Sequence, residues 1–140
     1  MKKLIIVLFL IGITTTYSQE TLDEQKIEQE LNRGKVSPSE PVSLNNGELI
    51  TEDKYYGLDG KPIYHNRITI DLREISAIET EFNDKSKIYV LKFISGSDKS
   101  ILETKIKSND LIKKKSTTIM LRINSELLNE IVKSLRDYKK

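Results

Sequence analysis

The sequence predicts an α+β fold: a mainly antiparallel β structure, bent or closed into a barrel, that is capped by a C-terminal amphipathic helix and preceded by a short N-terminal helix. Between residues 48 and 123, apolar and polar residues alternate in short runs that turn-forming residues separate, as in antiparallel strands. Residues 125–138 carry one broad apolar stripe at helical spacing, and residues 21–32 carry a thinner one.

The first eighteen residues have the features of a secretory signal peptide. Lys2 and Lys3 precede an apolar run over residues 4–13, and Thr16 and Ser18 are small residues at the positions that signal peptidase reads. A run of ten residues is too short to cross a bilayer, which needs about 20 apolar residues. The sequence therefore predicts an exported protein, periplasmic or secreted, whose mature chain begins near residue 19.

Composition narrows the possible partners. The chain has 140 residues, with 23 Lys and Arg against 21 Asp and Glu. The predicted signal peptide contains two of the lysines and no acid, so the 122 residues that follow have 21 of each and no net charge. A neutral chain argues against nucleic acid as a partner. Because the chain has no cysteine, it has no disulfide and must be stabilised by its core.

Residues 19–47 are expected to form a helix and a linker ahead of one domain over residues 48–140. Two of the three prolines and an Asn-Asn-Gly turn signal fall between residues 36 and 47, a composition typical of a linker. A chain of this length is expected to build a single core.

The expected N-terminal helix has start and stop signals. Thr21 and Glu24 have the spacing of a capping box, Ile27 and Leu31 share one face, and Gly34 is a natural stop. Because two side chains make only a thin apolar stripe, we expect this helix to pack at the edge of the domain or to be loosely attached.

Strands are expected from residue 49 onward. In chain order they cover residues 49–51, 54–56, 62–64, 67–72, 74–79, 88–94, 100–106 and 117–123. An Asp59-Gly60 pair favours a tight reversal between the second and third of these strands. The run 88–94 is apolar on both faces and is therefore expected to be a central strand, whereas residues 107–116 are expected to form a lysine-rich loop.

The C-terminal helix is expected to start after a cap at Asn124 or Ser125. Its apolar stripe consists of Leu127, Leu128, Ile131, Val132, Leu135 and Tyr138, and its outer face of Asn129, Glu130, Lys133, Ser134, Arg136 and Asp137. A helix this short is marginal alone in water, so the stripe must cover a sheet. Truncation before Asn124 is expected to unfold the domain.

The order of these elements resembles a known family. Residues 70–79 (IDLREISAIE), 87–93 (KIYVLKF) and 119–123 (IMLRI), followed by a closing helix, are similar to a pleckstrin-homology-like (PH-like) domain over about residues 48–140. The resemblance implies binding of lipid headgroups, peptides or proteins rather than catalysis. The basic phosphoinositide motif of that family has no counterpart here, so the resemblance assigns no site residue. A cystatin-like fold is the alternative, and it would make residues 21–32 the core helix; the thin stripe on that helix favours the PH-like fold.

Three tyrosines, Tyr55, Tyr56 and Tyr64, gather around one expected hairpin. Clustered tyrosines suit a recognition surface because they offer a large contact area at a low entropy cost. They are also ordinary residues of strands, where they fill sheet faces.

Five lysines form a second candidate set. Lys105, Lys107, Lys113, Lys114 and Lys115 could bind an anionic partner or surface, or could simply be a solvated loop. The acidic stretch over residues 20–30 could pair with this set, within one chain or between chains.

No catalytic, cofactor-binding or metal-binding motif is present. His65 is the only histidine and has no second His or Cys with which to bind zinc. We expect it to lie in a turn or at a strand edge. The chain lacks the G-x-S-x-G motif of a serine hydrolase, and its aspartates do not have the spacing of a calcium loop.

These observations together predict an exported, non-enzymatic binding module. The expected partner is a protein, a peptide or an envelope component, and a membrane surface is a further candidate. An exported cystatin-like inhibitor or immunity-type protein is the alternative. A hydrolase would require a deep pocket that holds His65 beside two carboxylates.

Overall fold

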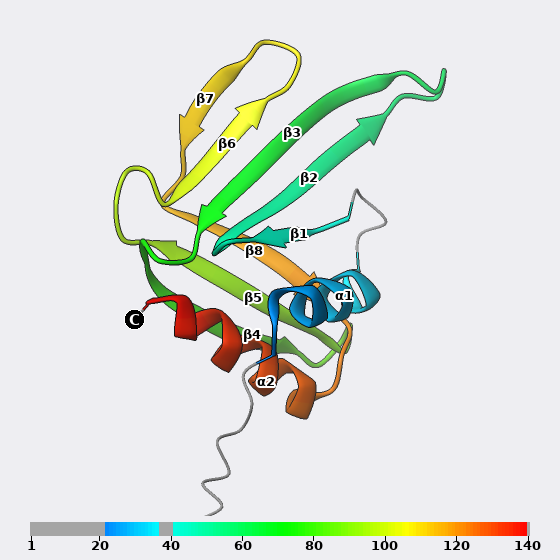
Figure 1. Cartoon of the computed structure of the whole chain (residues 1–140). Coiled ribbons are helices and arrows are strands. Elements are labelled where there is room, and N and C mark those ends of the chain that lie inside the picture. The colour runs from blue at the N-terminus through cyan, green and yellow to red at the C-terminus, as the bar shows by residue number, and fades with distance from the viewer. Residues whose placement is uncertain (1–21, 37–40, 140) are drawn as a thin grey trace, which may run out of the picture.

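A computed structural model describes residues 22–36 and 41–139; the predicted signal peptide and Thr21 lie outside this part of the chain. The described residues contain two α-helices and eight strands, and the strands form two antiparallel sheets (Figure 1). This arrangement confirms the α+β class. In chain order the elements are α1 (Glu24–Gly34), β1 (Ser43–Asn45), β2 (Glu48–Tyr56), β3 (Pro62–Asp71), β4 (Ile75–Asn83), β5 (Ile88–Ser95), β6 (Ile101–Lys105), β7 (Asp110–Lys113), β8 (Ser116–Leu121), α2 (Ser125–Arg136) and the 3-10 helix η1 (Asp137–Lys139).

The two sheets are parts of one sharply bent surface that does not close into a barrel. One sheet has the order β1-β2-β3-β6-β7 and the other has the order β4-β5-β8. The chain crosses from one sheet to the other three times, from β3 to β4, from β5 to β6 and from β7 to β8. The order β3-β6-β7 in the larger sheet therefore matches the order β4-β5-β8 in the smaller one. β5, the run that is apolar on both faces, is the central strand of the smaller sheet, as predicted.

The bend is made of small residues in close contact. The backbone N–H of Gly96 donates to the carbonyl oxygen of Glu74 at 3.1 Å, and a Cβ on Gly96 would lie 2.4 Å from that oxygen. The Ser100 hydroxyl, which is fully buried, lies 2.8 Å from the Ser95 hydroxyl and also donates to the carbonyl oxygen of Ser97. Only glycine allows the two crossing chains to approach this closely at Gly96.

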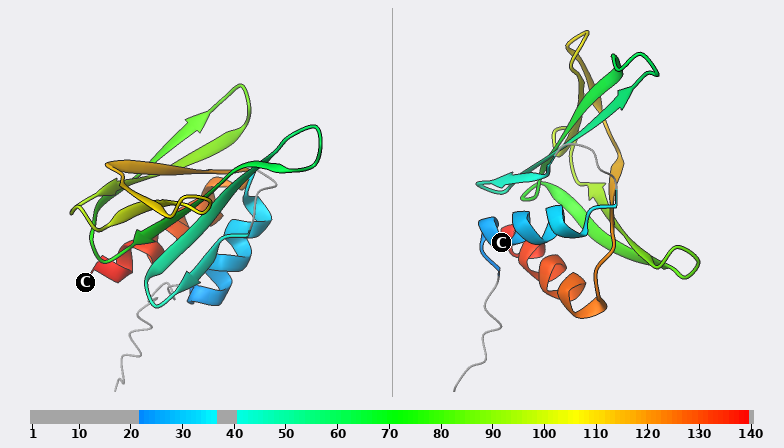
Figure 2. Two further views of the ribbon diagram at one scale, coloured as in Figure 1. Left: turned by 90° about the horizontal axis from the view of Figure 1, so that it is seen from above. Right: turned by 90° about the vertical axis from the view of Figure 1, so that its right-hand side faces the viewer.

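The core fills the concave side of the bend. Both helices lie there side by side, whereas the far ends of the β2–β3 and β6–β7 hairpins extend beyond them (Figures 1 and 2). Both sheets and both helices contribute buried apolar side chains to the core: Ile27, Leu31, Val42, Leu44, Leu49, Ile70, Leu72, Ile75, Ile78, Leu91, Phe93, Ile101, Ile119, Leu121, Leu128, Ile131, Val132 and Leu135.

The C-terminal helix is integral to the core, as its stripe predicted. Asn124 is the N-cap, and its side chain accepts a hydrogen bond from the backbone N–H of Leu127 at 2.7 Å. Two residues assigned to the outer face instead contact other elements. The buried Ser134 hydroxyl accepts from the backbone N–H of Leu22, and Arg136 donates to the carbonyl oxygen of Ile78.

The N-terminal helix is also part of the core, so the prediction of a loosely attached helix is wrong. Ile27 and Leu31 are completely buried. The apolar stripe is thin because a polar stripe runs beside it: Glu24, Glu28 and Asn32, four residues apart, accept hydrogen bonds from the backbone N–H groups of Gly47, Leu44 and Val42, respectively. α1 therefore provides hydrogen-bond acceptors for the backbone N–H groups along the free edge of β1, which have no neighbouring strand there.

The cap of α1 also differs from the prediction. The helix begins at Glu24, and Asp23 is its N-cap, with its carboxylate accepting from the backbone N–H of Lys26 at 2.8 Å. Thr21, the partner of Glu24 in the expected capping box, lies outside the described residues; the Glu24 carboxylate binds the backbone N–H of Gly47 and the Tyr138 hydroxyl, which donates at 2.7 Å. The cap is therefore Asp23, two residues later in the chain than the predicted cap at Thr21.

Two strands form where the sequence predicted none. β1 lies within the stretch expected as a linker, and it is joined to β2 by a two-residue turn at Asn46 and Gly47, both with positive φ. β7 lies within the stretch expected as a lysine-rich loop and pairs with β6. All four β7 residues are exposed, which is why their pattern did not indicate a strand.

We expect Leu31→Ala to lower the free energy of unfolding by about 2–5 kcal/mol, because it leaves a cavity in a fully buried site. Urea denaturation measures the change, and Gln29→Ala on the exposed face of α1 is the matched control. A loss below about 0.5 kcal/mol, the size of a surface effect, would mean that α1 is loosely attached.

The Glu24 carboxylate should make stability depend on pH. Hydrogen bonds from Tyr138 and from the backbone N–H of Gly47 lower the pKa of Glu24 from its usual 4.5. A lowered pKa in the folded state contributes stability above the usual value, and this stability is lost as the pH falls below it. Glu24→Gln is therefore expected to lower the urea midpoint at neutral pH, and its difference from wild type should shrink below about pH 4.5. A difference that grows on acidification would contradict this assignment.

Candidate functional site

The ends of the β2–β3 and β6–β7 hairpins project away from the core. These ends, residues 53–66 and 104–112, are called the hairpin lobe here (Figures 1 and 2). Three of the four strands of the lobe begin or end in the core: Leu49, Ile70 and Ile101 are aligned across β2, β3 and β6 and are fully buried, whereas all residues of β7 are exposed. Farther along the same strands no side chain is fully buried, so the lobe has no core of its own.

The end of the β2–β3 hairpin is apolar and exposed. Its five large side chains, which we call the apolar tip, are Tyr55, Tyr56, Leu58, Ile63 and Tyr64. Leu58 in the turn is as exposed as in an extended chain, and Ile63 and Tyr55 are 65% and 63% exposed. The rings of Tyr55 and Tyr64 stack, with centroids 5.3 Å apart and planes at 15°. These exposures exclude a simple role in filling the core.

The turn at the apolar tip is tight, as the Asp59-Gly60 pair predicted. The backbone N–H of Gly57 donates to the carbonyl oxygen of Lys61 at 2.7 Å, and Gly60 has φ +75°. A turn this short leaves no chain to fold back over Leu58. The exposure of that side chain is therefore built into the hairpin.

A band of polar residues separates the apolar tip from the core on both faces of the sheet. On the core-facing side, Asn66 and Lys114 both bind the Glu103 carboxylate, at 2.7 and 3.0 Å. On the opposite side, Glu52 binds His65 and Arg67. We call these six residues the polar band. Because it interrupts the apolar surface, the tip is a separate cluster rather than the rim of the core.

His65 is part of this band. It lies within β3, rather than in a turn, and its Nε2 is 2.8 Å from Glu52 Oε2, while the Arg67 guanidinium binds Glu52 Oε1 at 2.7 Å. Partial burial alone would raise the pKa of Glu52, but the hydrogen bonds from His65 and Arg67 outweigh it and lower that pKa from its usual 4.5. Both oxygens of the carboxylate are thus engaged in holding β2 to β3.

The structure divides the five candidate lysines. Lys105 and Lys107 belong to the hairpin lobe, and the Lys107 ammonium donates to the carbonyl oxygens of Pro62 and Ile63 at 2.5 and 3.3 Å. Lys113 and Lys114 are neighbours in the chain and point to opposite faces, where they pair with Asp98 and Glu103. Lys115 follows them at the junction to β8, where its carbonyl oxygen accepts from the backbone N–H of Ser95.

The sequence allowed pairing of these lysines with the acidic stretch over residues 20–30, within one chain or between chains; among the described residues of one chain, Glu24, Glu28 and Glu30 have other partners. Glu24 and Glu28 bind backbone N–H groups at β1 and its turn, and Glu30 pairs with Arg33. The structure instead brings Lys105 and Lys107 to the same lobe as the three tyrosines. Two of the five candidate lysines and the three tyrosines, which the sequence indicated separately, therefore belong to one lobe.

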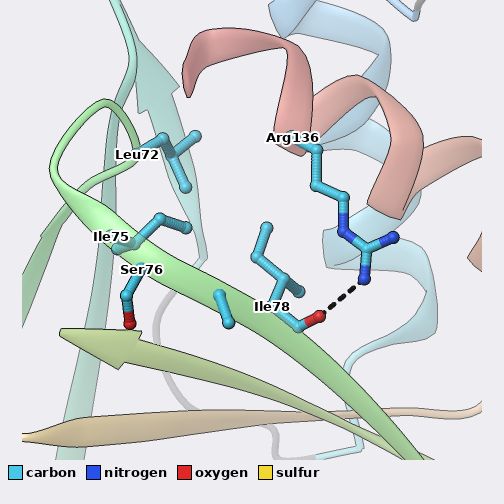
Figure 3. A pocket seen from close by; sticks show the side chains of 6 residues that line it. Leu72, Ile75, Ser76, Ile78 and Arg136 are labelled. Carbon is cyan, nitrogen blue, oxygen red and sulfur yellow. Dashed lines mark hydrogen bonds between the residues drawn. The ribbon is translucent and has the colours of Figure 1, made fainter. Parts of the chain in front are cut away.

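A small pocket lies between β4 and α2, away from the lobe. It encloses about 260 Å³ and is lined by Leu72, Ile75, Ser76, Ala77, Ile78 and Arg136 (Figure 3). Arg136 lies at its side, where Nη2 donates to the carbonyl oxygen of Ile78 at 2.7 Å. A second, more open hollow of about 650 Å³ adjoins it and shares Ile78 and Arg136.

This contact protects the free edge of β4. Edge strands present unpaired carbonyl groups that can pair with other chains. Arg136 occupies one such carbonyl, the register shifts between Ile75 and Ala77, and Glu79 and Glu81 put charge on the same strand. All three features discourage pairing with another strand.

His65 is not among the residues that line either of the two hollows.

In the described ranges, no group of three or more His, Cys, Asp and Glu side chains is arranged to hold a metal ion. Neither described helix is long and apolar enough to span a membrane. No protein-family model, curated protein or solved structure matches the chain.

Because the apolar tip has no folding role, Leu58→Ser should change the free energy of unfolding by about 0.5 kcal/mol or less. Urea denaturation of the mature chain measures this. A loss comparable to that of a core substitution would show that Leu58 is buried in solution and that the lobe is folded differently.

Proposed function

We propose that this protein is an exported, non-enzymatic binding module whose hairpin lobe contacts a protein, a peptide or an envelope component. The observation that carries the proposal is the apolar tip, five large exposed side chains cut off from the core by the polar band. An apolar cluster of this kind costs free energy in water and gains it when a partner covers it.

The geometry of the tip favours binding. Stacking of Tyr55 on Tyr64 limits the freedom of both rings before any partner arrives. The hydrogen bonds of Lys107 to Pro62 and Ile63 hold the two hairpins together. A surface that is already ordered loses less conformational entropy on association, which strengthens binding.

Export is supported by the sequence of residues 1–18, with its two lysines, its apolar run and its small residues before position 19. A periplasmic or secreted location would place the lobe among envelope components. The neutral charge of the following 122 residues argues against nucleic acid. The engagement of both Glu52 oxygens by His65 and Arg67 supports a structural role for the only histidine.

The PH-like resemblance of residues 48–140 stays an interpretation, and the cystatin-like alternative gains one observation. Burial of Ile27 and Leu31 removes the argument that the N-terminal helix is too weakly apolar to be a core helix. An exported inhibitor or immunity-type protein is therefore the second candidate. In that case the apolar tip would enter a cleft of a protein target.

The proposal is tested by retention of envelope material on the immobilised mature chain. Leu58→Ser should reduce the retained amount at least about tenfold, because the contact of one buried Leu side chain contributes about 1.5–3 kcal/mol. Met120→Ser is the matched control: Met120 is also an exposed apolar residue, but it lies in β8, away from the lobe. Equal retention by wild type and Leu58→Ser, or an equal loss in both variants, would contradict a binding role for the lobe.

A further inference from the structure

The apolar side chains of the tip point in several directions. Tyr55 and Tyr64 are cross-strand partners on the core-facing side, whereas Tyr56, next along β2, points to the opposite side. Leu58 occupies the turn itself. A partner that packs flat on one face of a sheet would cover only one of these sets. The distribution fits a medium that surrounds the end of the hairpin.

The residue types at the end of the hairpin are a second feature of the tip. Leu58 lies in the turn together with Asp59 and next to Lys61, the tyrosines follow, and Lys54 lies two residues behind Tyr56, or about 7 Å at the rise of an extended strand. An exposed Leu at the end of the hairpin, tyrosines behind it and lysines on both sides of the tyrosines are residue types that suit the surface of a bilayer. Tyrosine favours the interface between hydrocarbon and headgroups, and lysine extends its ammonium into the headgroup layer.

The lobe is positively charged although the exported chain is neutral. Within the lobe, residues 53–66 and 104–112, the four cations Lys54, Lys61, Lys105 and Lys107 outnumber the three anions Asp53, Asp59 and Asp110 by one. The carboxylates behind this surface are engaged: Glu52 binds His65 and Arg67, and Glu103 binds Asn66 and Lys114. Lysines near a membrane are attracted to anionic lipids.

From these three features we propose that the apolar tip inserts end-on into the interfacial layer of a bilayer that contains anionic lipid. This inference rests on the proposed function and names the partner of the same surface. Leu58 and Ile63 enter the hydrocarbon boundary, the tyrosine rings lie at the level of the headgroups, and the four lysines contact anionic headgroups. The core and both helices stay outside the bilayer.

The first test is flotation of residues 19–140, which include every described contact, with vesicles of phosphatidylcholine alone or with phosphatidylglycerol added. Binding should require phosphatidylglycerol and weaken at high salt. Leu58→Asp should weaken it at least about tenfold, whereas Met120→Asp should not. Absence of binding to the anionic vesicles, or equal binding to both vesicle types, would overturn the inference.

The second test locates the inserted residue. The chain has no tryptophan, so a single Leu58→Trp substitution reports on that position alone. Its emission should shift to shorter wavelength with anionic vesicles and be quenched by brominated lipid, and a Met120→Trp control should show neither effect. Identical behaviour of the two reporters would overturn end-on insertion.

The two proposals can fail separately. If Leu58→Ser abolishes retention of envelope material but wild type does not bind anionic vesicles, the lobe recognises a protein or peptide; the binding function then stands and membrane insertion is overturned. If neither envelope material nor vesicles depend on Leu58, both proposals are overturned.

Discussion

Burial of two helices on the concave side of a sharply bent sheet is the constraint on which the rest of the structure depends. Neither sheet could cover its inner face alone, and the core draws side chains from both sheets, α1 and α2 together. α1 has a double role in this closure. Its apolar face supplies Ile27 and Leu31, and its polar stripe binds the backbone along the edge of β1. The helices thus seal the core and one sheet edge at once.

The same constraint explains why the hairpin lobe exists as a separate zone. The helices cover only one part of the larger sheet, so β2, β3, β6 and β7 extend past the core (Figure 2). Cross-strand hydrogen bonds and the polar band around Glu52 and Glu103 stabilise this extension instead of apolar packing. Apart from the stacked rings of Tyr55 and Tyr64, the apolar side chains at its end stay exposed to solvent. A lobe held by hydrogen bonds, with an apolar end, is a structure suited to contact with something outside the molecule.

Much of the fold could be predicted from local sequence patterns. Alternation of apolar and polar residues located most of the strands, the Asp59-Gly60 pair located the turn at Gly60, and the broad apolar stripe identified α2. The importance of α1 was missed because only apolar side chains were counted; Glu24, Glu28 and Asn32 also recur every four residues, and that spacing could have indicated a second contact face. β7 was missed because an exposed edge strand has no buried face to impose a pattern.

The candidate site was predicted only in part. The tyrosines and the lysines were both visible in the sequence, but the proximity of Lys105 and Lys107 to the tyrosines depends on the pairing of β3 with β6, strands far apart along the chain. No local pattern fixes such a pairing, because it follows from the way in which the bent sheet closes around its core.

The central claim is that the molecule has a sealed core and a lobe without one. Amide hydrogen exchange of the free mature chain, followed residue by residue, tests it most directly: amides of α1, α2 and β5 should exchange slowest, in a global unfolding step, and those at residues 54–64 much faster. Equal protection of the lobe and the core, or rapid exchange throughout α1, would contradict this account.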